Sequence, residues 1–65
     1  MTRTIPATDA ADSTDIVTFW VSGDGQGSLD MSGMTAADAL AELLAQCSDA
    51  DDAAGVMAGC FDLAE

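Results

Sequence analysis

The sequence predicts a small α+β domain: an N-terminal β-hairpin followed by two short helices and closed by a short third antiparallel strand. Three observations predict this class: a β-branched and aromatic run at 15–22, helix-start signals at Thr35 and Ser48, and renewed alternation at 60–63. A chain of 65 residues is long enough for one domain with one modest core. We expect that domain, a single acidic unit, over residues 15–65.

An N-terminal arm, residues 1–14, precedes this domain. The arm is rich in Thr, Ala and Asp and offers little but Ile5 as a large apolar side chain. Pro6 interrupts regular structure because it has no backbone N–H to donate. We expect the arm to be flexible unless it docks.

Residues 15–22 (DIVTFWVS) have the composition of a strand. Strict alternation divides the side chains between two faces, with Val17, Phe19 and Val21 on one and Ile16, Thr18 and Trp20 on the other. Both faces are largely apolar, which predicts a central strand or one whose second face meets the arm or a partner. Trp20 is then either covered by another segment or exposed as an interface anchor.

A turn and a return strand follow. Residues 23–27 contain three glycines, which permit positive φ angles. Residues 28–32 alternate, so Leu29 and Met31 are expected inward and Asp30 outward.

The first helix is predicted over 35–47. Thr35 and Asp38 have the spacing of a capping box, and strong helix formers follow. The helical period gathers an apolar side that consists of Ala36, Leu40, Leu43, Leu44 and Cys47. Asp38 and Glu42 share the opposite side.

A second helix is predicted over about 49–58, because Ser48 and the acids after it repeat the start signal. Gly59 suits the cap that ends this helix. Residues 60–63 alternate again and predict a third strand that pairs with the first. Continuation of the helix is the alternative.

The composition excludes several classes of function. There is no His and no Lys, so neither a catalytic base nor a zinc site is available, and loops that start at Asp24 or Asp49 do not match a calcium-binding loop. We therefore expect no enzymatic activity, no cofactor and no metal. Cys47 and Cys60 are expected as reduced, buried thiols, with a disulfide between them as the less favoured alternative. No run approaches the ~20 apolar residues of a membrane span, and no signal peptide is evident, so we expect a cytoplasmic monomer.

The charge is the dominant feature: 12 acids stand against Arg3 alone, for a net charge of −11. Such a chain repels nucleic acid and anionic membranes and attracts basic protein surfaces. On the predicted elements the acids form a nearly unbroken negative field, comparable to the phosphates of DNA. The candidate partner-binding residues are Asp24, Asp30, Asp38, Glu42, Asp49, Asp51 and Asp52.

Residues 2–9 (Thr-Arg-Thr-Ile-Pro-Ala-Thr-Asp), residues 15–20 (Asp-Ile-Val-Thr-Phe-Trp) and the length resemble the phage-encoded anti-CRISPR proteins directed at type I-C systems. The resemblance covers the whole chain and implies a stoichiometric inhibitor of the Cascade surveillance complex in the host bacterium. The implied target is a DNA-handling surface, such as the one on the large subunit that recognises the protospacer-adjacent motif. No family site residue transfers position by position, so the candidate residues come from charge placement alone.

Two other functions remain open at this point. One is an antitoxin-like or regulatory protein that neutralises another basic protein. The other is an acidic structural subunit, as in halophiles, which salt would stabilise, whereas a DNA mimic would lose its partner in salt.

Overall fold

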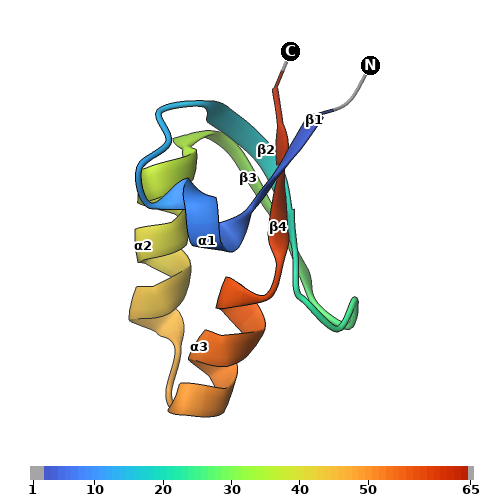
Figure 1. Ribbon diagram of the computed structural model, residues 1–65, viewed down its shortest axis with the longest axis vertical. Coiled ribbons are helices and arrows are strands. Elements are labelled where there is room, and N and C mark those ends of the chain that lie inside the picture. The colour runs from blue at the N-terminus through green and yellow to red at the C-terminus, as the bar shows by residue number, and fades with distance from the viewer. Residues whose placement is uncertain (1–2, 65) are drawn as a thin grey trace.

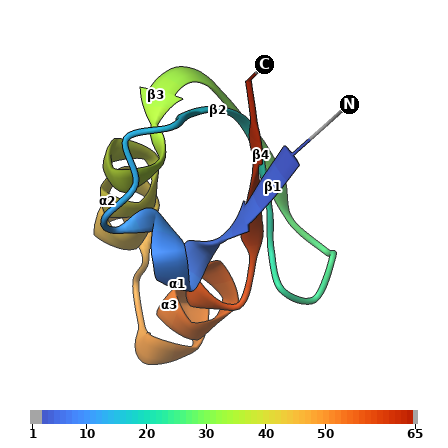
Figure 2. The same ribbon diagram turned by 45° about the horizontal axis from the view of Figure 1, so that its top comes forward.

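The computed structural model of the protein describes residues 3–64. In chain order its elements are β1 (Arg3–Pro6), α1 (Ala7–Ala10), β2 (Ile16–Val21), β3 (Ser28–Thr35), α2 (Ala36–Gln46), α3 (Ala50–Met57) and β4 (Cys60–Leu63). The strands form one antiparallel sheet in the order β1-β4-β2-β3, and the helices cover one of its faces (Figure 1 and Figure 2). The α+β class is confirmed, and β1 and α1 add a fourth strand and a third helix to the predicted elements.

The segment that we expected as an arm belongs to the same sheet and core. Ile5 of β1 pairs with Phe61 of β4, and Ala7 and Ala10 of α1 are fully buried. Pro6 lies on an edge strand, where its missing N–H interrupts no ladder with a further strand. The arm residues 3–10 therefore dock, and the boundary between residues 14 and 15 separates no structural unit.

A β-bulge in β2 changes which side chains face the helices. The register shifts between Val17 and Phe19, so Val17 and Trp20 both point into the core. Ile16 and Phe19 lie on the opposite face and are 42% and 36% exposed. Strict alternation had grouped Val17 with Phe19 and Trp20 with Ile16. That grouping is wrong because the extra residue inverts the order of the two faces.

Local capping defines the start of α2. The Thr35 hydroxyl accepts a hydrogen bond from the backbone N–H of Asp38 at 3.2 Å, as the capping box predicts. The Asp15 carbonyl accepts from the Ala36 N–H at 2.8 Å, so the loop before β2 satisfies another helix-end donor. The buried face of α2 includes Ala39, whereas Leu44, which we expected there, is exposed.

The second predicted helix is α3, and its two ends differ from expectation in detail. Asp49, rather than Ser48, is the N-cap residue. Gly59 does not end the helix in a positive-φ conformation, since the positive-φ glycines are Gly25 and Gly33. A Cβ at position 59 would instead lie 2.9 Å from the Trp20 indole nitrogen and in contact with the Val21 carbonyl oxygen. Glycine is required here because the backbone passes so closely over β2.

The core lies between the sheet and the helices, with Phe61 and Val17 as its largest fully buried side chains. Their partners on α2 include Leu40 and Leu43, which continue the same buried cluster. Within residues 3–64, no helix has the length and apolar character needed to cross a membrane.

Candidate partner-binding surface

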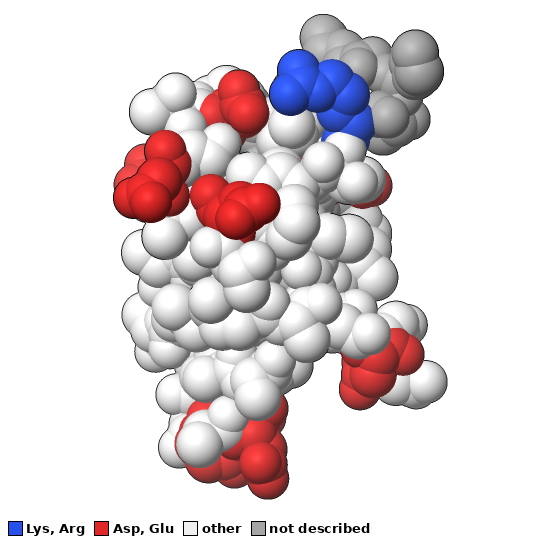
Figure 3. Space-filling model, in the orientation of Figure 1, with Lys and Arg blue, Asp and Glu red and all other residues white. Residues whose placement is uncertain are grey.

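The acidic side chains lie in separate groups. On the face shown in Figure 3, acids gather over the end that carries α1 and the start of α2, over the start of α3, and at the β2–β3 turn, with uncharged surface between them. The expectation of a nearly unbroken field is therefore wrong for this face. The reason is local: these acids occur in turns and in the first turns of helices, and the fold places those segments at opposite ends of the molecule.

The seven candidate residues are likewise separated, some at one cleft and the others elsewhere on the surface. Three of them, Asp24, Asp51 and Asp52, line one cleft. Asp49 lies beside the cleft as the cap of α3. Asp30 is on β3, and Asp38 and Glu42 are on α2, so these three do not line the cleft.

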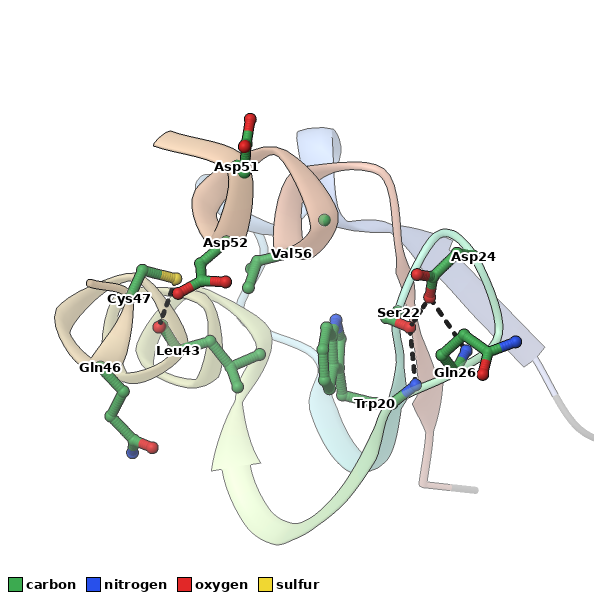
Figure 4. A pocket seen from close by; sticks show the side chains of 12 residues that line it. Trp20, Ser22, Asp24, Gln26, Leu43, Gln46, Cys47, Asp51, Asp52 and Val56 are labelled. Carbon is green, nitrogen blue, oxygen red and sulfur yellow. Dashed lines mark hydrogen bonds between the residues drawn. The ribbon is translucent and has the colours of Figure 1, made fainter. Parts of the chain in front are cut away.

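The cleft lies between the tip of the β2–β3 hairpin and the helices α2 and α3, and has a volume of about 450 Å³ (Figure 4). It is open to solvent, and its lining residues are Trp20, Ser22, Asp24, Gln26, Gly27, Leu43, Gln46, Cys47, Asp51, Asp52, Gly55 and Val56. A backbone hydrogen bond of 3.2 Å from Gly23 to the Gly55 carbonyl joins the hairpin to α3 at its edge. That contact brings together residues from segments far apart in the sequence.

The hairpin turn holds Asp24 in a fixed position. Its Oδ1 accepts from the Ser22 hydroxyl at 2.6 Å and from the Gln26 N–H at 2.9 Å. The Gly27 N–H donates to the Ser22 hydroxyl at 2.9 Å, and Gly25 has φ of 75°, which completes the turn. The hydrogen bond from Ser22, followed by the one from Gln26, lowers the pKa of Asp24. Asp24 therefore stays ionised below the usual pH range for an aspartate.

Capping also fixes two of the acids at the start of α3. The Asp49 carboxylate accepts from the Asp52 N–H at 2.9 Å, and the Asp52 carboxylate accepts from the Ser48 hydroxyl at 2.8 Å. Negative charge is also favourable here because the helix dipole is positive at its N-terminus. Asp49 and Asp52 thus stabilise the fold as well as charging the surface, whereas the Asp51 side chain forms no hydrogen bond within residues 3–64.

Trp20 stands at the floor of the cleft and is only 9% exposed. It is not the exposed anchor that one hypothesis required, because the turn from α3 to β4 covers it at Gly59. Its indole Nε1 has no hydrogen-bond acceptor in the described part of the chain. Figure 4 shows this nitrogen pointing toward α3, between the side chains of Val56 and Ser22.

The uncovered face of the sheet carries a different acidic arrangement. Phe19 lies between Asp30 on β3 and Asp62 on β4 in the strand register. The Ser32 hydroxyl donates to Asp30 at 2.8 Å, and with the Ser32 N–H it lowers the pKa of Asp30. Asp62 was not among the candidate residues, although its alternation with Phe61 and Leu63 could have indicated an outward position.

Asp9, Asp12 and Asp15 were also absent from the candidates; Asp9 and Asp12 belong to the segment that we expected as an arm, and Asp15 begins the first predicted strand. Their place near the start of α2 depends on tertiary contacts, such as the hydrogen bonds that the Ala36 and Ala37 N–H groups donate to the carbonyl oxygens of Asp15 and Ser13. No local sequence signal reports such contacts.

The described residues contain no group of three or more side chains suited to hold a metal ion. Cys47 and Cys60 are free thiols and half-buried, so no disulfide joins them. The comparisons with protein-family models, with curated proteins and with solved structures gave no match. Function is therefore inferred from charge placement and surface shape.

Proposed function

We propose that this protein is an acidic DNA mimic that binds a basic DNA-handling surface of the type I-C Cascade complex and blocks recognition of target DNA. The observation that carries the proposal is the convergence of Asp24, Asp51 and Asp52 on one cleft at the end where Asp49 caps α3. The resemblance of residues 2–9 and 15–20 to type I-C anti-CRISPR proteins supports the choice of target.

Electrostatics supports a basic protein as the partner. A net charge of −11 steers the chain toward positive surfaces and raises its association rate at low salt. The same charge opposes binding to nucleic acid or anionic lipid. A surface built to hold DNA phosphates offers arginine and lysine side chains at close spacing, and carboxylates satisfy them in the same way.

Preorganisation of the carboxylates supports tight binding. Asp24 is held by its turn, and Asp49 and Asp52 are held by the cap of α3. Side chains that are already ordered lose less conformational entropy when a partner binds. The two groups therefore act as fixed charges, as phosphates do on a duplex.

The test is duplex DNA binding by purified type I-C Cascade, with and without an equimolar amount of this protein, at two salt concentrations. Loss of DNA binding at low salt and its recovery at high salt is the expected result, because salt screens the ion pairs. Unchanged DNA binding with stable association of the two would place the block at a later step. No association with Cascade at either salt concentration would contradict the proposal and favour another basic protein as the partner.

A further inference from the structure

We infer that the cleft between the hairpin tip and α3 receives an arginine side chain from a basic segment of the partner protein. The inference rests on the proposed function, which requires only a basic partner, and adds the place and the chemistry of the contact. A volume of about 450 Å³ lies within the ~300–1,000 Å³ typical of binding pockets. Because the cleft is open, it suits a side chain presented by a protein surface.

Two opposing walls supply carboxylate oxygens that the fold leaves free. On the hairpin side, both recorded hydrogen bonds to Asp24 use Oδ1 and leave Oδ2 without a partner among residues 3–64. On the α3 side, both bonds from Ser48 use Oδ2 of Asp52 and leave its Oδ1 free in the same range. Figure 4 shows these carboxylates on opposite sides of Trp20, while Asp51 extends away from the floor.

No basic side chain of residues 3–64 lines this cleft. Arg3 is the one basic side chain in the sequence, and it lies on β1. Figure 3 shows it at the end of the molecule opposite the acids of α3. The charges of Asp24 and Asp52 are therefore available to a cation from outside.

The floor of the cleft is apolar and aromatic. Trp20, Leu43 and Val56 line it, and they suit the methylene stem of a long basic side chain. A cation near an indole ring also gains from the ring's negative face. The Trp20 N–H is a buried donor without an acceptor among residues 3–64, and it points toward α3.

Arginine fits this arrangement better than lysine. Its planar guanidinium carries five donors in a fixed fork, so it can pair with one carboxylate through two parallel hydrogen bonds and keep donors for a further acceptor. It also stacks on an aromatic ring more readily, because it is less strongly hydrated than an ammonium group. Lysine offers a compact, strongly hydrated charge that cannot form this two-bond pairing with a carboxylate.

The experiment titrates the protein with an oligo-arginine peptide and, separately, with an oligolysine peptide of equal length. The fluorescence of Trp20, the single tryptophan, and its indole N–H signal in a ¹⁵N-labelled sample report occupation of the cleft. We expect both signals to change with oligo-arginine and the affinity for oligolysine to be several-fold lower. Binding without any change at Trp20, or equal binding of both peptides, would overturn the inference.

Two double variants separate the cleft from the overall charge. Asp24→Asn with Asp52→Asn removes both charges from the cleft and keeps one carbonyl oxygen at each position for the turn and cap bonds. Asp9→Asn with Asp12→Asn removes two charges from the other end. We expect the cleft variant to bind oligo-arginine on the order of tenfold more weakly and the control to change by less than about threefold.

Urea denaturation of both variants first establishes that each is folded. Equal weakening in the two variants would show that the peptide follows net charge, which overturns the cleft assignment and leaves the proposed function standing. Signal changes at Trp20 on concentrating the protein without peptide would indicate a second copy as the occupant and would also overturn it. The Cascade assay judges the proposed function independently.

Discussion

Gly59 and Gly55 provide a sharp test of the packing between α3 and the sheet. Adding a methyl group at Gly59 would place it 2.9 Å from the Trp20 indole nitrogen and against the Val21 carbonyl oxygen. The second neighbour is backbone of the central strand β2, so it cannot move away without disturbing the sheet ladder. Overpacking of this kind costs about 1–3 kcal/mol. We expect Gly59→Ala to lower the free energy of unfolding by that amount.

Gly55 is the matched control. It lies inside α3, and a Cβ there would meet no atom within 4 Å. Alanine is more favourable than glycine in a helix by about 0.5–1 kcal/mol, so Gly55→Ala should stabilise the protein. The same chemical change is thus expected to have opposite signs four residues apart.

Urea denaturation, followed by Trp20 fluorescence and independently by circular dichroism, measures both changes. For a domain of this size, 1 kcal/mol corresponds to a shift of about 4–8 °C in Tm. Gly59→Ala should therefore melt clearly below the parent and Gly55→Ala above it. A Gly59→Ala protein as stable as the parent would refute the close approach of the α3–β4 turn to β2.

Three further predictions concern caps and charges. Thr35→Ala should lower the free energy of unfolding by about 0.5–2 kcal/mol, measured in urea, because the Asp38 N–H loses its acceptor; no change would contradict the observed cap. Asp51→Lys should weaken binding to the proposed basic partner with little loss of stability. Asp49→Lys should weaken binding and also lower the free energy of unfolding, since Asp49 caps α3. Equal stability of the two variants would contradict the assigned cap. Hydrogen bonds lower the pKa of Asp24 and Asp30 in the folded protein. The two ionised carboxylates therefore stabilise the folded state above the unfolded pKa of ~3.9, and this stabilisation is lost as the pH falls through the folded pKa values. Carbon-detected titration should find both carboxyls titrating below the unfolded-state value; titration at that value would show that these bonds do not persist in solution.

The role of Asp49 and Asp52 changes how the acidic turn can be tested. Simultaneous charge reversal of Asp49, Asp51 and Asp52 would not separate an effect on binding from an effect on folding, because two of the three carboxylates also hold the first turn of α3. Substituting Asp51 alone, or replacing the capping aspartates by Asn, removes charge while keeping the hydrogen bonds that hold the first turn of α3.

Local signals sufficed where neighbouring residues decide the structure. The capping box at Thr35, the acids before α3 and the alternation at 60–63 predicted α2, α3 and β4 within one or two residues of their observed ends. These elements depend on hydrogen bonds and periodicities that span only a few positions. The same reasoning missed β1, since four residues that contain a proline carry little strand signal before β4 is present to pair with them.

The candidate site was predictable only in its charges. Composition and the single Arg3 were enough to predict a basic protein as the partner, and Asp24 and Asp52 were named on that basis. Their convergence on one cleft could not be read from the sequence. It depends on the bond between Gly23 and Gly55 and on the close packing of Gly59 against β2, which join segments about thirty to forty residues apart.

The sequence by itself determined the class of the fold, the helix starts and the sign and size of the charge, because capping, periodicity and ionisation are properties of residues and their near neighbours. The tertiary structure decided which face of β2 is buried, whether the arm docks, and which acids share a cleft. A one-residue bulge inverts Phe19 and Trp20, and burial of Ala7 and Ala10 requires the finished core. These outcomes depend on packing between distant segments, which no local pattern contains.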